Sequence, residues 1–99
     1  QNLFSHFQAQ HLYTLILINI KRYMDLSNYD VEIKHHVFIQ AMKREIHPDF
    51  IEDTLTKGKM ERFGKNGVKF ISEGSKRTII CVGEMAGTKI RIFTIEEGN

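Results

Sequence analysis

The sequence is poor in the residues that cross-link or interrupt a chain. It contains one cysteine, Cys81, so no disulfide can form within the chain, and a reducing, cytoplasmic location is the simplest expectation. One proline and seven glycines exclude collagen-like and proline-rich chains. Cys81 lies in the apolar run from Thr78 to Val82, where burial raises the pKa of a thiol. We therefore interpret Cys81 as a core residue and not as a nucleophile.

No hydrophobic run is long enough to cross a membrane. The longest apolar stretch, from Leu12 to Ile20, is interrupted by Thr14 and Asn19, whereas a spanning helix needs about 20 apolar residues. Basic residues follow this stretch instead of preceding it, which is not the order found in a signal peptide. We expect neither a membrane segment nor secretion.

Motifs for cofactors, metals and covalent catalysis are also missing. There is no nucleophile elbow and no CxxC pair, and the glycines are spaced as hairpin turns instead of a phosphate-binding loop: Gly64, Gly67, Gly74 and Gly87. The adjacent His35 and His36 diverge on either a strand or a helix, and no cysteine or carboxylate spacing completes a zinc site. The sequence predicts no cofactor and no metal.

The composition that remains is ordinary for a globular protein. The chain has 99 residues, of which 41% are hydrophobic and 26% are charged, and this excludes a fully disordered chain. Its length predicts one domain. Fourteen Lys and Arg against twelve Asp and Glu give a net charge of +2, and the isoelectric point is about 8.8. This mildly basic balance permits RNA binding without requiring it.

Acidic residues are missing from residues 1–23, which are rich in Phe, Leu, Ile and Gln. The apolar spacing predicts a helix from about Ser5 to Tyr23 with a wide apolar arc, although the run from Leu15 to Ile20 also fits a strand. We interpret residues 1–24 as a helical extension and residues 25–99 as the main domain. The extension is either an ordinary core helix or a dimerisation helix that joins two copies through residues 1–23.

A short strand and two helices are predicted next. The segment from Tyr29 to His35 alternates with period two, and helices from His36 to Glu45 and from Pro48 to Lys57 follow it. Proline suits the first turn of the second helix. We expect Gly58 to end that helix in the left-handed conformation.

Four strands separated by turn residues complete the chain. Their predicted ranges are Lys59–Phe63, Val68–Ser72, Arg77–Glu84 and Lys89–Glu96. In the last strand we expect Ile90, Ile92 and Thr94 to alternate against Arg91, Phe93 and Ile95. The predicted fold is α+β: an N-terminal helix, a short strand, and two helices packed on an antiparallel meander of about four strands.

A wider pattern runs from about residue 29 to residue 97. His36 heads a helix, Arg44 follows eight residues later, and the last strand contains Ile92-Phe93-Thr94-Ile95. This pattern resembles an uncharacterised family of small domains that are similar to the RelE and BrnT ribonuclease toxins. The resemblance implies a RelE-like fold and a toxin-type, metal-independent activity on RNA, with an antitoxin-like protein as a partner.

Three positions depart from that family's pattern. Gln40 stands where members carry a second arginine, Glu45 where they carry glycine, and His47 where they carry serine or threonine. The departures at Gln40 and Glu45 favour a second hypothesis, a non-enzymatic module of the same fold that associates with itself or with an antitoxin-like partner.

Four residues, with Lys59 as a fifth, are candidates for an endoribonuclease site. Such a site needs a group that positions or deprotonates the 2′-hydroxyl, together with cations for the charge that develops on the phosphate. His36 is the candidate for the first role, and Arg44 and Arg77 for the second, because a guanidinium binds phosphate oxygens bidentately. Thr94, on the last strand, is expected nearby, and Lys59 is a further cation. The alternative is that His36 and Arg44 only tie their helix to the sheet.

Basic residues are densest between Lys57 and Arg77, where two acidic residues face seven basic ones. The candidates for contact with an RNA backbone are Lys57, Lys59, Arg62, Lys65 and Lys69. Phe63 or Phe70 would stack on bases. This stretch favours RNA binding; the alternative is a set of lysines that protects the edge of a sheet.

Overall fold

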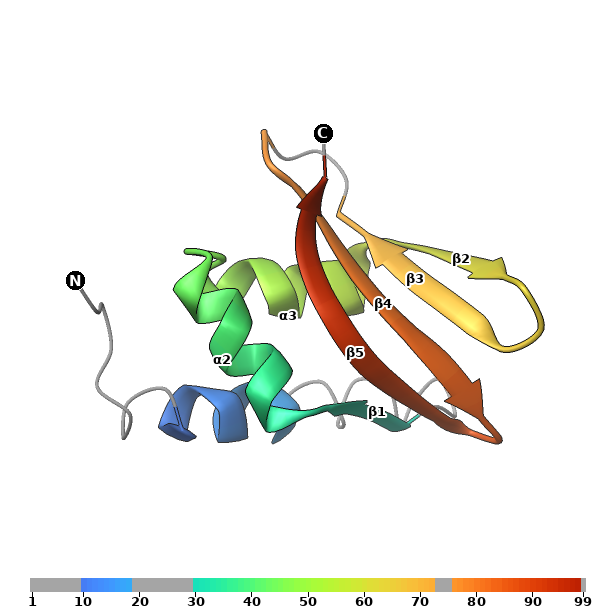
Figure 1. Ribbon diagram of the computed structural model, residues 1–99. Coiled ribbons are helices and arrows are strands. Elements are labelled where there is room, and N and C mark those ends of the chain that lie inside the picture. The colour runs from blue at the N-terminus through green and yellow to red at the C-terminus, as the bar shows by residue number, and fades with distance from the viewer. Residues whose placement is uncertain (1–9, 19–29, 73–75, 99) are drawn as a thin grey trace.

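The computed structural model describes residues 10–18, 30–72 and 76–98, which form three helical segments and five strands (Figure 1). Residues 10–18 are helical. The other elements are β1 (Asp30–Ile33), α2 (His35–Lys43), α3 (Pro48–Lys57), β2 (Lys59–Phe63), β3 (Gly67–Ile71), β4 (Thr78–Ala86) and β5 (Lys89–Gly98). No helix among the described residues is long and apolar enough to span a membrane.

All five strands belong to one sheet in the order β1-β5-β4-β3-β2. The strands from β2 to β5 are antiparallel neighbours, whereas β1 lies parallel to β5, with Asp30 opposite Lys89. The helices lie together on one side of the sheet (Figure 1). The predicted α+β class is confirmed, and the predicted four-strand meander gains β1 as a fifth strand at its edge.

The helix α3 begins and ends at the predicted residues, Pro48 and Lys57. Pro48 occupies its first turn, and Nδ1 of His47 accepts a hydrogen bond from the backbone N–H of Asp49 at 3.3 Å. A side-chain acceptor at this position satisfies one of the N–H groups that the first helical turn leaves unpaired. The boundary of α3 therefore follows from local chemistry that the sequence displays.

The prediction for Gly58 is wrong. Its backbone is extended, with φ −72° and ψ 169°, and not left-handed. Glycine is required here because a Cβ would collide with the carbonyl oxygens of Thr54 and Ile71. The chain thus passes from α3 into β2 at a point where helix and sheet backbones nearly touch.

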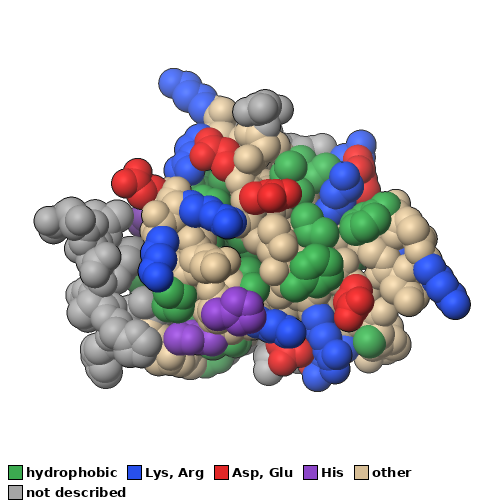
Figure 2. Space-filling view, in the orientation of Figure 1, with side chains coloured by type: hydrophobic (Ala, Val, Ile, Leu, Met, Phe, Trp, Pro, Cys, Tyr) green, Lys and Arg blue, Asp and Glu red, His purple; other side chains and the backbone are tan. Residues whose placement is uncertain are grey.

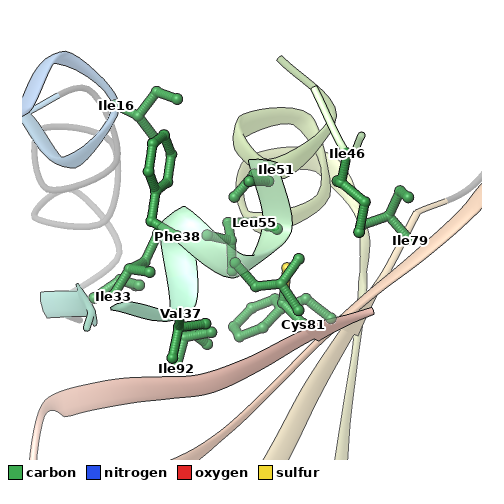
Figure 3. Close-up of a cluster of buried hydrophobic side chains, with 14 of the residues drawn as sticks. Ile16, Ile33, Val37, Phe38, Ile46, Ile51, Leu55, Ile79, Cys81 and Ile92 are labelled. Carbon is green, nitrogen blue, oxygen red and sulfur yellow. The ribbon is translucent and has the colours of Figure 1, made fainter. Parts of the chain in front are cut away.

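One hydrophobic core fills the space between the helices and the sheet (Figure 3). Its fully buried side chains come from every layer and include Val31, Ile33, Phe38, Ile46, Ile51, Val68, Ile79, Ile90, Ile92 and Ile95. Cys81 is also buried, which confirms its assignment to the core. Burial raises the pKa of its thiol to about 12, so the thiol stays protonated and unreactive near neutral pH.

Tyr13 connects the helical residues 10–18 to the rest of the core. Its hydroxyl donates a hydrogen bond to the carbonyl oxygen of Ile33 at 2.6 Å. Its ring meets the rings of His35 and Phe38 edge to face, with centroids 4.9 and 5.3 Å away. This part of the predicted N-terminal helix is therefore a core helix; residues 1–9 and 19–23 of the prediction lie outside the described residues.

The alternation predicted for the last strand fails at Phe93. The register of β4 and β5 shifts between Val82 and Gly83, which leaves Phe93 as an extra residue on β5. Beyond such a bulge the alternation of side chains changes phase. Ile95 is therefore only 1% exposed and lies in the core, whereas Thr94 shares the opposite face of the sheet with Phe93.

Candidate functional site

His36 and Arg44 lie at opposite ends of α2. His36 is exposed in the first turn and Arg44 is the C-cap residue. Eight residues at 1.5 Å each separate them by about 12 Å along the helix axis. Nη1 of Arg44 donates a hydrogen bond to the carbonyl oxygen of Ile95 at 3.0 Å, so this arginine ties the helix to the sheet. The structure does not bring these two residues to one point.

Arg77 joins the end of β5 to the corner between α2 and α3. Its Nε and Nη2 donate to the two carboxylate oxygens of Glu97 at 3.0 and 2.8 Å, and its Nη1 donates to the carbonyl oxygen of Glu45 at 3.0 Å. The guanidinium also lies 5.7 Å from the centre of the Phe50 ring. Hydrogen bonding within the pair lowers the pKa of Glu97 and raises that of Arg77. At least three of the five N–H donors of Arg77 are thus engaged in structural bonds.

The corner that Arg77 holds contains a strained residue. Glu45 has φ 61°, in the left-handed region, which costs a residue other than glycine about 1–2 kcal/mol. Its N–H donates to the carbonyl of Met42, and the N–H of Ile46 donates to that of Ala41, which together form a Schellman motif. Glu45 therefore adopts, at an energetic cost, a backbone conformation that glycine adopts without a steric penalty.

Thr94 lies on the other side of the sheet from His36. It aligns with Val82, which in turn aligns with Lys69, whereas the neighbouring Cys81 and Ile95 align within the core. We call the side that carries Thr94 the outer face, because the helices cover the other side. The bulge at Phe93 places Thr94 on this face, so the expected neighbourhood of Thr94 and His36 does not form.

The predicted RNA-contact residues are spread over several surfaces. Lys59 and Lys69 lie on the outer face, because they align with Ile71 and Val82 there. Arg62 aligns with the buried Val68 and therefore lies on the helix side of the edge strand β2.

The two other candidates in that set lie beyond the strands. Lys57 is in the last turn of α3, where its Nζ lies 3.8 Å from a carboxylate oxygen of Asp53. Lys65 is exposed in the turn between β2 and β3. The basic stretch of the sequence therefore does not become one basic surface.

Hydrophobic side chains remain exposed on the outer face, which no described helix covers. Phe93 is 47% exposed and Phe63 is 43% exposed, and the strands between them contribute the half-buried Ile71, Ile80 and Val82. The ring of Phe63 lies against Gly67, where a Cβ would collide with it. Figure 2 shows hydrophobic side chains gathered over the strands with charged side chains beside them.

Several basic side chains on the outer face lie beside acidic ones. Nζ of Lys59 lies 3.5 Å from a carboxylate oxygen of Glu61. Glu32 lies 3.6 Å from Nε of Arg91 and 4.0 Å from Nζ of Lys89. The outer face therefore combines exposed hydrophobic side chains with basic and acidic groups, and Lys69 lies beside the Phe63 ring. Among the described residues, no group of three or more His, Cys, Asp or Glu could hold a metal ion.

The predicted alternation put Phe93 and Arg91 on one face, as the structure does, but it missed the bulge and so placed Thr94 with Ile90 and Ile92. One signal could have located the bulge. Gly83 lies inside a predicted strand, and a glycine in that position is typical of a bulge or of a close approach between backbones.

Comparisons with protein-family models, with curated proteins and with solved structures found no match. The resemblance to RelE-like domains stays a prediction. A functional conclusion for this chain has to be drawn from its own geometry.

Proposed function

We propose that this chain is a non-enzymatic protein-binding module and that its outer face binds another protein. The observation that supports this most strongly is the set of hydrophobic side chains, led by Phe63 and Phe93, that no described element covers. Exposed apolar patches rimmed by polar groups commonly mark protein interaction sites, and aromatic side chains are enriched at them.

The charge pattern favours a protein partner over a nucleic acid. Binding to an RNA backbone depends on unpaired positive charge that replaces counterions on the phosphates. On the outer face Lys59, Lys89 and Arg91 each have an acidic side chain within 4.0 Å. An RNA strand would have to compete with these carboxylates, whereas a protein surface with mixed charges would complement them.

The position of the candidate catalytic residues favours binding over cleavage. Three groups would have to meet at one phosphate, yet His36 and Arg44 are at opposite ends of α2 and Thr94 is across the sheet. Arg77 already donates to Glu97 and to the Glu45 carbonyl. These contacts support structural roles for the two arginines.

RNA binding remains a second candidate function, because of one specific contact. Nζ of Lys69 lies 5.8 Å from the centre of the exposed Phe63 ring. A cation beside an aromatic ring is the combination that binds single-stranded RNA, with the ring stacking on a base and the cation contacting the backbone.

The identity of the protein partner is a further part of the proposal. An antitoxin-like protein in the cytoplasm is the partner that the family resemblance implies. Self-association through residues 1–23 is an alternative that Leu15 and Ile18 support, since their side chains are 45% and 49% exposed on the helical residues 10–18. Most of the remaining segment lies outside the described residues.

Induced expression in a bacterial culture tests binding against cleavage. Wild type and His36→Ala are produced to equal soluble levels, and total RNA from each culture is separated on a denaturing gel. We expect intact RNA and the same growth for both, because His36 is exposed and isolated from the other candidates. RNA fragmentation by the wild type, lost in His36→Ala, would overturn the proposal in favour of a ribonuclease.

A further inference from the structure

The strand β2 ends the sheet, and no described strand pairs with its outer edge. Both of its faces are accessible: four of its five residues are exposed, and Glu61 is half-buried. Figure 1 shows the β2–β3 hairpin projecting away from the helices. Such an edge offers a row of N–H and C=O groups to another strand.

The register of the sheet shows which backbone groups point outward. The N–H of Ser72 donates to the Ile79 carbonyl at 2.9 Å, and the N–H of Met85 donates to the Asn66 carbonyl at 2.8 Å. In an antiparallel ladder, alternate residues bond to alternate neighbours. The even-numbered residues of β3 therefore bond to β4, and the odd-numbered ones bond to β2. It follows that Met60 and Arg62 direct their N–H and C=O groups to the open edge.

We propose that β2 pairs antiparallel with β2 of a second copy of this chain, with Met60 opposite Met60 of the second copy. This register places Lys59 opposite Glu61 of the second copy, twice, on the outer face. These positions form non-hydrogen-bonded pairs, in which facing side chains come closest, and opposite charges there are stabilising. Met60, 39% exposed in the single chain, becomes buried against its counterpart on the helix side.

The other symmetric registers are less favourable. A two-fold axis perpendicular to the sheet relates the two strands, and opposed residues then lie on the same face of the sheet. One residue therefore lies on the axis, opposite the same residue of the second copy, and the alternative registers differ in which residue this is. Centring on Glu61 sets two carboxylates opposite each other, and centring on Arg62 sets two guanidinium groups opposite each other, and like charges there are destabilising. Centring on Lys59 likewise sets two ammonium groups opposite each other, so among the charged residues of β2 itself only the register centred on Met60 pairs unlike charges.

The same register brings a basic side chain to the C-terminal end of α3 in the second copy. Arg62 then faces Gly58 of the second copy, which is the C-cap of the second copy's α3. A cation beside the C-terminal end of a helix is stabilised by the helix dipole. The N–H of Gly58 already donates to Thr54, but its carbonyl can accept the N–H of Arg62. Lysine on an edge strand usually blocks pairing, but here a glutamate lies opposite each Lys59.

This inference does not depend on the proposed function, because it concerns the edge of β2 and not the outer face around Phe93. Sedimentation velocity of the full chain over about a hundredfold range of concentration tests it. We expect the mean sedimentation coefficient of the wild type to rise with concentration. Lys59→Glu and Glu61→Lys each replace two attractive pairs by two repulsive ones, and each should weaken self-association about tenfold or more.

Mixing Lys59→Glu with Glu61→Lys is the most specific test of this register. Each is self-repulsive, but an equimolar mixture sets Glu opposite Lys at both positions and should regain association. Lys65→Glu, which makes the same charge change in the turn, should behave as the wild type. Met60→Pro should abolish pairing, since proline is tolerated on an edge strand only where its missing N–H faces solvent.

Three outcomes would overturn the inference. A wild type that stays monomeric at every concentration would do so. Association that survives in both Lys59→Glu and Glu61→Lys would also overturn the inference. This comparison does not depend on whether Met60→Pro folds. Loss of association in Leu15→Asp, with none in Lys59→Glu, would assign the dimer to residues 1–23 instead.

Discussion

Replacing Phe38 with alanine should lower the free energy of unfolding by about 3–5 kcal/mol. The side chain is fully buried, and its ring meets that of Tyr13 at 5.3 Å. Figure 3 shows the ring of Phe38 beside Ile16, so its removal takes away packing between α2 and the helical residues 10–18. A loss of that size is a large share of the about 5–15 kcal/mol that typically holds a domain together. Urea denaturation measures it.

Phe93→Ala is the matched control. The same atoms are removed from a side chain that is 47% exposed on the outer face. Substitutions at exposed positions usually change stability by about 0.5 kcal/mol or less. If the two variants lose equal stability, the N-terminal helix and Phe38 do not form the core described above.

Gly83→Ala should destabilise the protein by about 2–3 kcal/mol, although it adds a single methyl group. A Cβ at this position would collide with the carbonyl oxygen of Arg91 and lie 3.0 Å from Cδ1 of Ile92. The central strand β4 meets its neighbour β5 here, beside the bulge at Phe93. A backbone oxygen cannot move aside as a flexible side chain can. We therefore expect the β4–β5 ladder to open locally.

Thermal and urea unfolding measure that loss, and amide hydrogen exchange locates it. The N–H groups of β4 and β5 next to position 83 should exchange faster in Gly83→Ala, with α3 unchanged. Gly87→Ala is the control, because its Cβ meets nothing within 4 Å and its cost of about 1–2 kcal/mol comes from a φ of +66° alone. Equal losses and unchanged exchange around position 83 would contradict the close approach.

Local chemistry explains which elements were predictable. Pro48 and His47 mark the start of α3, and the turns at Gly64 and Gly87 have the positive φ that glycine favours. Long-range features were not visible. The parallel pairing of β1 with β5 joins residues that lie far apart in sequence, such as Asp30 and Lys89, and no local pattern encodes that register.

The candidate site was harder to predict than the fold, because residue type indicates chemistry but not orientation. Arg77 was a reasonable phosphate ligand in the sequence, yet its bidentate partner is Glu97, twenty residues away on β5. Thr94 changed faces because one extra residue, Phe93, shifts the alternation of β5. Lys59 and Arg62 are close in sequence but lie on opposite faces of the sheet, because alternate positions of β2 face opposite sides.

Site-specific photo-crosslinking tests the central claim, that the outer face binds protein, most directly. Phe93 is replaced by p-benzoylphenylalanine, and the same substitution at exposed Asp53 on α3 serves as the control. After irradiation of cells that naturally produce the chain, position 93 should give discrete adducts that resist ribonuclease and contain a second protein, and position 53 should not. Adducts at position 93 that ribonuclease removes, or the same adducts at both positions, would contradict the account.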